Sequence, residues 1–554
     1  MFLNIRQTLQ ELIKQSLPPL ETVPVIFIDI PADKAHGELT CNIALQLSRV
    51  LKKSPMIVAG EILPNLQKNL EAHALKDTFS KIEIKNPGFI NFYFSPKAFY
   101  QILETVLEKK YTYGYSNYGE NTPFCLEFVS ANPTGPLTVA HGRQAAVGDS
   151  LVNILNAVGY KAQKEYYVND EGNQINILGR SIFFRAKEIL GETLEFPEDA
   201  YQGDYIRTMA KELIKKQGVQ TAAGLDSLDP QVFRQFGVDY LMNVIREDLK
   251  DFNVHFDIWS YQSRIATNSA IEEVLKDFQS KGYIYENEGA LWFKSTNWGD
   301  DKDRVVKKSN GDYTYLTPDI VYHKDKFARG FKRIVNILGP DHHGYIPRIK
   351  AAAAALGHSV NDLDVVIVQL ASIYRDGKPV SMSTRRGEFI TLREVIDEVG
   401  KDAGHFFFLM RQTNAHLDFD LELAKKTSSE NPVYYIQYAH ARIHSIIRKA
   451  TDEAQLAPQS TGFNLLKEET EMDLMRKIAL YPEILVACAK QLDPFPLVRY
   501  LQELAGCFHK FYDSHRVLDD NKQLSRERLG LIEAARIILG SGLKLLGVGT
   551  PEKM

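Results

Sequence analysis

The sequence predicts a multidomain α/β protein with a mostly parallel sheet at its centre, an α+β module before it and a helical bundle after it. Short apolar strands alternate with helices through residues 123–400, which is the pattern of a parallel sheet covered by helices on both faces. Residues 81–95 alternate apolar and polar side chains around an Asn-Pro-Gly turn and predict a hairpin. After residue 431, apolar side chains recur at spacings of three and four, as on one face of a helix.

Composition excludes several classes of protein. The chain has 554 residues, 44% of them hydrophobic and 25% charged, which are ordinary values for a soluble protein of several domains. No run of about eighteen apolar residues occurs, so we expect no membrane span. The N-terminal MFLNIRQTLQELIKQSL predicts an amphipathic helix, with Glu11 inside it, rather than a signal peptide. The net charge of −4 neither indicates nor excludes a nucleic-acid partner, because phosphate contacts depend on local patches.

The cysteines indicate a reducing compartment. They number four and form no CxxC pair, which argues against a zinc knuckle or a disulfide framework. We therefore expect a cytoplasmic protein. The cysteines are Cys41, Cys125, Cys488 and Cys507.

The two flanking regions have predictable elements. In residues 1–110 we expect a helix at about 3–17, a strand at 23–30, helices at 41–53 and 59–73, and then the hairpin. The segment YTYGYSNYGENT at 111–122 is typical of a linker. In the bundle we expect helices at 433–447, 472–490, 497–518 and 527–546.

The central region is expected to carry strands at 126–129, 164–168, 333–338 and 365–370, with helices such as 147–158 and 348–356 beside them. The interval 178–300 is richer in helix and charge and predicts an insertion into the sheet fold. Neither a Walker-type GxxxxGK motif nor GxGxxG occurs, so nucleotide binding requires another cradle.

The stretch LEFVSANPTGPLTVAHGRQAAVGDS at 126–150 supplies such a cradle. It begins as a strand, breaks at a turn containing Asn132, Pro133, Gly135 and Pro136, and enters a helix at about His141. Exposed backbone N–H groups and the positive end of the helix dipole then point at an anion. Many strand–helix connections contain Gly and Pro, so the turn alone is a modest signal.

Three later stretches strengthen this signal. They are YTYLTPD at 313–319, followed by His323; GPDHHG at 339–344; and VSMSTRRGEFIT at 380–391. Ligands of open α/β sheets bind at the carboxyl ends of the strands, and both the turn and GPDHHG follow predicted strands. We expect them to face one crevice, with VSMSTRRG folding over it as a mobile loop.

These motifs carry a resemblance to a known family. The 126–150 stretch resembles the HIGH motif of class I aminoacyl-tRNA synthetases, and MSTRRG resembles their KMSK loop. SANPTGPL, YYVNDEGNQ, YTYLTPDIVYH, DHHGY, GEFITL and NPVYYIQYAHAR resemble arginyl-tRNA synthetases of the bacterial type, at the family's spacing. The likeness runs from Pro31 to Met554.

The resemblance implies a domain plan and a reaction. Residues 1–110 would be the tRNA-contacting N-terminal domain, 111–430 the class I Rossmann-like catalytic domain with its KMSK-like loop at 381–387, and 431–554 the anticodon-binding bundle. The family converts ATP and L-arginine to arginyl-adenylate and transfers the arginyl group to tRNA(Arg). It uses Mg²⁺ with the ATP, generally activates arginine only with tRNA bound, and is typically monomeric. No resident metal site is implied.

The resemblance also assigns the substrate residues. Attack of the arginine carboxylate on the α-phosphorus needs positioning and donors rather than a protein nucleophile. A guanidinium pairs bidentately with a carboxylate. The arginine site would consist of Glu127, Asn132, Tyr315 and Asp319. The ATP site would consist of Pro136, Ala140, His141, Gly339, Asp341, His342, Met382 and Ser383, with Thr138, His141, Arg385 and Arg386 as catalytic groups.

Structural alternatives remain open at this stage. His141 and Asp319 also fit helix caps, Tyr315 fits a core aromatic, and His343 fits a metal ligand, although no spaced carboxylate accompanies it. Which of the two carboxylates takes the larger share of the guanidinium stays undecided.

The tRNA contacts are also implied by the resemblance. Phe89 and Asn91 match positions where the family reads a D-loop adenosine by stacking and hydrogen bonding. Phe89 fits a hairpin core residue as well. For the anticodon arm the candidates are Tyr438, His440, Arg442, Arg499 and Tyr500, although packing on helical faces explains the aromatic ones nearly as well.

Two departures from the family pattern concern ATP. Thr138 stands where the HIGH motif begins with His, and Ala140 stands where Gly is usual. The KMSK position reads Ser-Met-Ser-Thr at 381–384 and has neither lysine. Some arginyl enzymes place a lysine just before HIGH instead, but Gly135 occupies that place here. Positive charge is then available from Lys307, Lys308 or Lys378, or from Arg385 and Arg386, which lie on the loop itself and are our first choice.

Two other functions compete with an active arginyl-tRNA synthetase. The degraded motifs also fit a non-catalytic tRNA-binding relative, but the intact arginine set weighs against it. A nucleotidyl transferase acting on a small molecule fits the HIGH-type motif, but it leaves the bundle and the N-terminal module unexplained.

Arg385→Ala and Arg386→Ala are each expected to slow adenylate formation much more than they weaken arginine binding, because their charge faces the phosphates. Single-turnover rates and arginine KM values measure the two effects separately. Unchanged rates in both variants would dispose of the hypothesis.

Overall fold

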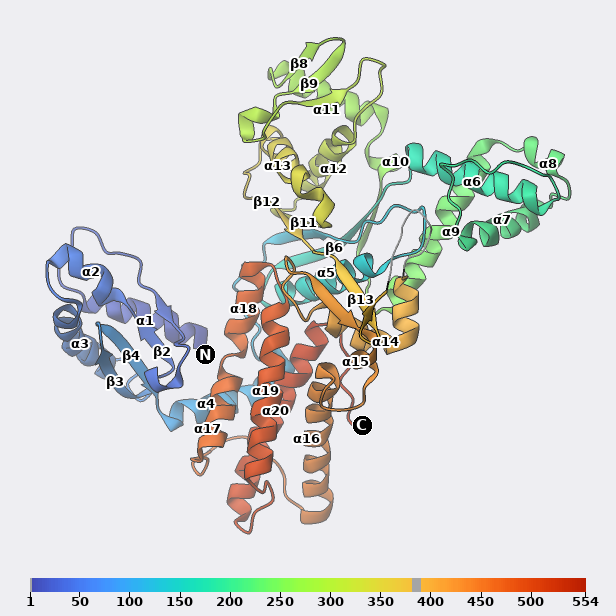
Figure 1. The fold of residues 1–554 in the computed structure, drawn as a ribbon. Coiled ribbons are helices and arrows are strands. Elements are labelled where there is room, and N and C mark those ends of the chain that lie inside the picture. The colour runs from blue at the N-terminus through green and yellow to red at the C-terminus, as the bar shows by residue number, and fades with distance from the viewer. Residues whose placement is uncertain (1, 381–389) are drawn as a thin grey trace.

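A computed structural model describes residues 2–380 and 390–554 and confirms the predicted fold class (Figure 1). The N-terminal module packs helices against a four-stranded antiparallel sheet in the order β1-β2-β4-β3. The expected strand at 23–30 shortens to β1, because only two of its residues pair with β2. The elements are α1 (Phe2–Ser16), β1 (Ile28–Asp29), the 3₁₀ helix η1 (Lys34–His36), β2 (Leu39–Cys41), α2 (Ile43–Leu51), α3 (Pro55–Glu71), β3 (Phe79–Lys85) and β4 (Phe89–Phe94).

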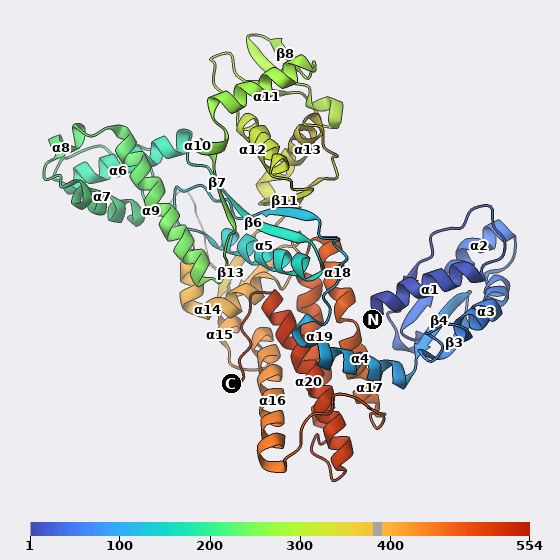
Figure 2. The same ribbon diagram turned by 180° about the vertical axis from the view of Figure 1, so that it is seen from behind.

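Helix α4 (Pro96–Lys109) leads out of this module. It starts where Ser95 accepts a hydrogen bond from Ala98 N–H and Pro96 occupies the first helical position, a common helix start. Its inner face contacts α17 and α20 of the C-terminal bundle. The module therefore stands beside the bundle and away from the central sheet, as both views show (Figures 1 and 2).

The central sheet is parallel and has the order β12-β11-β5-β6-β7. Alternate residues of its strands face two cores: Leu126 and Val335 pack on the side of α5, whereas Cys125 and Ile334 pack with α12 and α13. This is why the strands read as continuous apolar runs. The elements are β5 (Pro123–Glu127), α5 (Val139–Ala157), β6 (Lys161–Val168), β7 (Ile258–Tyr261), α12 (Leu316–Ala328), β11 (Arg333–Leu338), α13 (Ile346–Ala355) and β12 (Leu363–Ile367).

Strand β7 divides the predicted 178–300 insertion into two excursions. The first is a helical arm between β6 and β7, and the second carries a small antiparallel sheet between β7 and β11 (Figure 1). The sequence missed β7 because its four residues, IWSY, are too few to show a period. The arm contains α6 (Asn173–Ile189), α7 (Asp204–Gln217), α8 (Ala222–Asp226) and α9 (Pro230–Asp251). The second excursion contains α10 (Gln262–Ile265), α11 (Asn268–Ser280), β8 (Ile284–Asn287), β9 (Ala290–Phe293), the 3₁₀ helix η3 (Ser295–Trp298) and β10 (Arg304–Lys307).

A buried arginine joins α5 to the segments that follow the sheet. Arg143 has no exposed area, and its guanidinium donates to the backbone carbonyls of Gln369 (2.7 Å), Gln412 (3.0 Å) and Ala415 (3.0 Å). Burial lowers the pKa of Arg143 to about 10. These segments belong to a second small sheet, β14-β13-β15, and its helices. The elements are β13 (Ala371–Arg375), β14 (Lys378–Pro379), α14 (Leu392–Phe408), β15 (Leu417–Asp420) and α15 (Leu421–Lys425).

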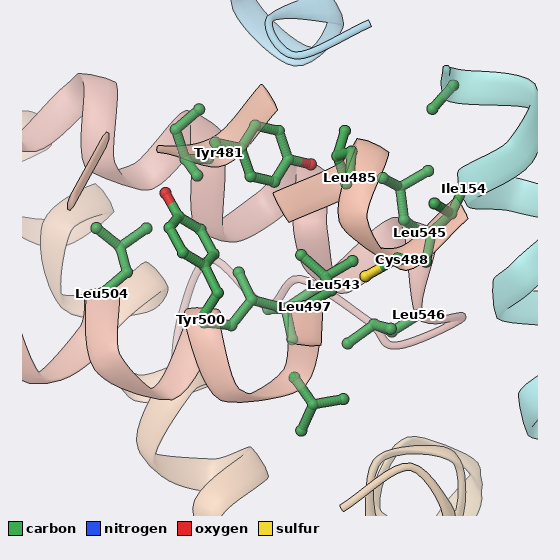
Figure 3. Close-up of a cluster of buried hydrophobic side chains, with 14 of the residues drawn as sticks. Ile154, Tyr481, Leu485, Cys488, Leu497, Tyr500, Leu504, Leu543, Leu545 and Leu546 are labelled. Carbon is green, nitrogen blue, oxygen red and sulfur yellow. The ribbon is translucent and has the colours of Figure 1, made fainter. Parts of the chain in front are cut away.

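The C-terminal region is a helical bundle, as predicted, with one difference. The expected helix at 472–490 is two helices, because Pro482 lacks an N–H and starts the second one at its first turn. Figure 3 shows the core that these helices share with Ile154 of α5, so the bundle is packed directly on the central α/β part. The helices are α16 (Pro432–Ala454), α17 (Glu469–Ala479), α18 (Tyr481–Gln491), α19 (Phe495–Ser514) and α20 (Lys522–Leu545).

Candidate active site

A pocket of about 950 Å³ opens at the carboxyl ends of β5 and β11. The strand order reverses between these two strands, since β6 and β7 extend the sheet on one side and β11 and β12 on the other. Such a switch point is where open α/β sheets bind ligands. The structure thus brings the 126–150 stretch, YTYLTPD and GPDHHG to one crevice, as predicted. The fourth stretch, at 381–389, lies outside the described residues.

The backbone turns sharply where β5 ends. Val129 and Ser130 have φ values of 65° and 40°, a left-handed conformation that is strained for a β-branched residue. Contacts with the neighbouring strand hold this turn in place. The Ser130 hydroxyl donates to Glu127 Oε1 (3.0 Å) and accepts from the backbone N–H of Tyr167 (3.0 Å). The turn therefore fixes the direction of the Glu127 carboxylate.

Glu127 is already paired with a cation. Lys326 of α12 has no exposed side-chain area and donates to Glu127 Oε2 at 2.5 Å and to Asn336 Oδ1 at 3.1 Å. Burial alone would lower the pKa of Lys326, but Glu127, Cys125 and Glu165 together outweigh it and raise that pKa. The charge of Glu127 is thus largely balanced inside the protein.

A chain of hydrogen bonds continues from this pair to Asp319. Asn336 Nδ2 donates to His323 Nε2 (2.9 Å), and His323 Nδ1 donates to the backbone carbonyl of Asp319 (2.8 Å). A carbonyl oxygen only accepts, which assigns the ring proton to Nδ1. Burial lowers the pKa of His323 to about 3, so the ring is neutral at physiological pH. The network therefore links the Glu127 carboxylate to the backbone of Asp319, the other acidic residue of the predicted arginine site.

Asp319 forms no ion pair with any described residue, although it lines the pocket. Its Oδ2 accepts a hydrogen bond from the Tyr345 hydroxyl. Burial raises the pKa of Asp319 to about 6, while the Tyr345 hydrogen bond acts in the opposite direction. Tyr315, four residues earlier, is 73% exposed at the pocket wall. A carboxylate that is held in place but unpaired suits a cationic ligand.

His141 presents one ring nitrogen as a donor. It is the third residue of α5, and its Nδ1 accepts from the backbone N–H of Thr138 (3.1 Å), the residue that caps the helix. This contact assigns the ring proton to Nε2. Burial lowers the pKa of His141 to about 4, so it donates as a neutral imidazole. Together with the positive end of the α5 dipole, it suits an anion.

The loop after β11 forms another wall. It contains Gly339 and the 3₁₀ helix η4 (Pro340–Tyr345). A Cβ at position 339 would lie 2.7 Å from Asp341 Oδ1, so glycine leaves room for this carboxylate. Asp341 and His342 are exposed and lie 3.1 Å apart. Together with α5, the loop shapes the part of the pocket that suits a nucleotide.

Comparison with known sequences decides the family. The profile named "Arginyl tRNA synthetase N terminal domain" matches residues 4–94, "tRNA synthetases class I (R), catalytic domain" matches 102–440, and "DALR anticodon binding domain" matches 436–554. The arginine–tRNA ligase of Syntrophotalea carbinolica is 44% identical over 552 residues, which is 99% of each chain. That of Bacillus subtilis is 43% identical over 98% of this chain and 97% of its own.

The chain belongs to the arginyl-tRNA synthetase family. Solved structures agree on the fold. Thermus thermophilus arginyl-tRNA synthetase superimposes with a TM-score of 0.78 at 20% identity, over 99% of this chain and 100% of that one. The enzyme from Plasmodium falciparum gives 0.73 at 18% identity, over 100% of this chain and 98% of that one.

Most of the predicted substrate residues of this synthetase meet in the pocket. Pro136 and Thr138 are not among the described residues that line it. Thr138 lies behind His141, with its hydroxyl 3.2 Å from Nδ1, and acts as a helix cap rather than as a group on the pocket wall. The lining residues that were predicted are Glu127, Asn132, Ala140, His141, Tyr315, Asp319, Gly339, Asp341 and His342.

The predicted cations of the KMSK-like loop stay untested. Met382, Ser383, Arg385 and Arg386 lie outside the described residues. Of the other candidates, Lys307 makes a cation–π contact with Tyr313, its Nζ lying 5.4 Å from the ring centroid. Neither Lys307, Lys308 nor Lys378 lines the described part of the pocket.

Two predicted tRNA contacts of the bundle are wrong. Tyr500 is 2% exposed, donates its hydroxyl to Lys477 O at 2.8 Å and lies within the bundle core (Figure 3). His440 is also buried, with Nδ1 2.9 Å from Pro551 O. Helical-face packing is therefore the correct explanation for both. Tyr438, Arg442 and Arg499 are exposed and remain predictions.

In the N-terminal sheet, Phe89, Asn91 and Tyr93 alternate along β4 on the face opposite to the helices. Asn91 is 2% exposed, and its Oδ1 accepts a hydrogen bond from the Thr40 hydroxyl (2.7 Å). In the free protein its side chain is therefore buried, whereas the predicted contact with a base requires it to be accessible. Phe89 and Tyr93 are half-buried on either side of it. Their contact with an unpaired base stays a prediction.

The sequence interpretation missed the groups that orient the pocket. They include Ser130, Gln144, Lys326 and Tyr345. One signal was readable: Asp319, Tyr322 and Lys326 follow at spacings of three and four and so share a helix face. A lysine in HKDKF otherwise reads as a surface residue.

Two features are absent from the part of the chain that the structure describes, a metal-binding cluster of three or more side chains and a membrane-spanning helix. No group of three or more His, Cys, Asp or Glu side chains there is placed to hold a metal ion. No helix of residues 2–380 or 390–554 is long and apolar enough to cross a membrane.

Lys326→Met is expected to impair arginine binding and folding, because it leaves Glu127 buried without its cation, at a cost of about 3–5 kcal/mol. Adding Glu127→Gln removes both charges, so the double variant should recover arginine affinity and thermal midpoint relative to either single variant. The exposed pair Lys324 and Glu273, on the same helix and α11, is the matched control and should show little effect. If the losses of arginine affinity in the two single variants simply add in the double variant, Glu127 contacts the guanidinium independently of Lys326.

Arginine binding to the free protein is expected to weaken below about pH 6, because Asp319 then takes up a proton and loses the charge that attracts a guanidinium. Above that pH the carboxylate is ionised and the affinity should level off. Tyr345→Phe removes a donor to the ionised form and should move the midpoint to higher pH. Calorimetric titrations from about pH 5 to about pH 8 measure both effects. An affinity that is constant across this range would contradict the role of Asp319.

Proposed function

We propose that this synthetase forms arginyl-adenylate in the pocket at the ends of β5 and β11. The observation that carries the proposal is the separation of two kinds of group in one cavity. Asp319 offers an unpaired carboxylate for the guanidinium, and His141 offers its Nε2–H, beside the N-terminus of α5, for phosphate oxygens. A substrate with a cation at one end and a nucleotide with a phosphate chain can meet between them.

The arginine end is built from four side chains in this proposal. Asp319 receives the guanidinium, with the Tyr315 hydroxyl beside it. The negative charge of Glu127 is largely balanced by Lys326, so most of the net negative charge at this end comes from Asp319. Asn132 is exposed at the pocket wall, donates to Gln174 (2.7 Å) and would hold the amino-acid backbone.

The nucleotide end follows from the loop after β11 and the start of α5. Gly339 leaves room for close approach, and Asp341 would accept from ribose hydroxyls. Ala140 lines the pocket where the base packs against α5. Mg²⁺ would arrive on the ATP phosphates, which supply most of its ligands, and so needs no cage of protein side chains.

The chemistry then requires orientation more than proton transfer. An oxygen of the arginine carboxylate attacks the α-phosphorus, the bond to the bridging oxygen of the β-phosphate breaks, and pyrophosphate leaves with the electron pair. The donors at His141 and α5 stabilise charge on the phosphate oxygens. In the second step a ribose hydroxyl of the terminal adenosine of tRNA(Arg) attacks the arginyl carbonyl, and AMP leaves.

The flanking regions would bind the tRNA. Phe89 and Tyr93 would stack on an unpaired base, as aromatic side chains of open sheets do. Tyr438, Arg442 and Arg499 would contact the anticodon arm. The proposal also places the domain limits at 1–110, 111–430 and 431–554. The protein would be a monomer in the cytoplasm.

Arginine-dependent exchange between ATP and pyrophosphate tests the function. We expect exchange with arginine in the presence of tRNA(Arg) and much less without it. Lysine, which carries the same charge without the planar fork, is the matched control and should give little exchange. No exchange with cognate tRNA would favour a non-catalytic tRNA-binding relative, and exchange with another amino acid would overturn the assignment of arginine.

A further inference from the structure

The pocket has few positive charges for a ligand as anionic as ATP. Its described wall carries four carboxylates, Glu127, Glu171, Asp319 and Asp341. Burial, together with the charge of Asp170, even raises the pKa of Glu171. A triphosphate entering this wall needs cations that are free to pair with it.

Most candidate cations of the wall are already committed. Arg304 donates to Asp300 through Nε (2.8 Å) and Nη2 (2.7 Å) and also pairs with Asp301. His342 lies against Asp341. The two other histidines, at 141 and 323, are neutral because burial lowers their pKa values.

Arg348 is the exception among the described residues of the wall. Its side chain lines the pocket and takes part in no hydrogen bond or ion pair with them, and its Nε is buried without a partner. The guanidinium lies next to GPDHHG, since a Cβ on Gly344 would be 4.0 Å from Nη2. It is thus held beside the loop that forms the nucleotide end of the pocket.

The position of Arg348 suits a phosphate chain. It is the third residue of α13, so the dipole of that helix adds positive potential near it. A half-buried guanidinium that lacks a partner has lost water without gaining hydrogen bonds, and a ligand oxygen can restore them. The planar fork matches phosphate oxygens in particular.

We propose that Arg348 binds the phosphate chain of ATP and supplies positive charge that this chain lacks at Thr138 and at the KMSK lysine positions. The proposal rests on the ATP site of the proposed function. Arg348 donates N–H bonds to oxygens of the departing pyrophosphate while the bond from the α-phosphorus to the bridging oxygen breaks. No proton leaves the guanidinium in this step, because it acts only as a hydrogen-bond donor.

Nucleotide binding to the full-length protein without tRNA tests this role. Arg348→Met should weaken binding of Mg²⁺–ATP by about tenfold to a hundredfold, the loss expected for a charge-assisted contact, and leave adenosine binding unchanged. Arg348→Lys, which keeps the charge but not the fork, should lie between. Lys350→Met is the matched control: Lys350 is on the same helix, does not line the pocket and lies 3.8 Å from Asp364.

The outcomes separate the two proposals. Equal weakening of ATP and adenosine, or no weakening of either, would overturn the role of Arg348. Unchanged ATP binding with impaired tRNA charging would assign Arg348 to a tRNA phosphate instead and would also overturn it. If the wild-type protein binds ATP but shows no arginine-dependent exchange, the proposed function is wrong. The role of Arg348 in phosphate binding is then still decided by the nucleotide-binding measurements on its variants.

Discussion

The active-site pocket depends on a buried lysine. Lys326 has no exposed area and would be unstable inside the protein without the Glu127 carboxylate 2.5 Å away. This requirement joins α12 to the end of β5, and the second donor contact, to Asn336, joins it to β11. The two strands that meet at the switch point are therefore held together by the same cation.

The network also explains how two acidic residues in one pocket take different roles. Glu127 has its charge balanced by the protein, whereas Asp319 is held by hydrogen bonds alone and keeps an unbalanced charge when ionised. Burial raises the pKa of Asp319 toward 6, which reflects the cost of that arrangement without a ligand. A guanidinium reverses this cost when it binds, so the site is tuned to a cation.

The nucleotide end has the opposite design. The donors proposed for it are the neutral His141 imidazole, the N-termini of α5 and α13, and Arg348, which has no partner among the described residues. Such preorganised donors stabilise charge that develops during reaction without having to rearrange. Arg143 contributes from behind, because its bonds to three carbonyls keep the start of α5 against the segments after β12.

The sequence alone determined the elements with a clear period and the motifs that follow strands. The hairpin at 79–94, the amphipathic face of α16 and the turns after β5 and β11 could be predicted because their signals lie within a few neighbouring residues. Tertiary structure alone decided that Lys326 is buried, that Tyr500 lies in the core and that Arg348 has no hydrogen-bond or ion-pair partner within residues 2–380 and 390–554. These properties depend on residues far away in the chain, such as Glu127, 199 positions before Lys326. Local patterns carry no information on such pairs, because charge and burial depend on which surfaces meet when the chain folds.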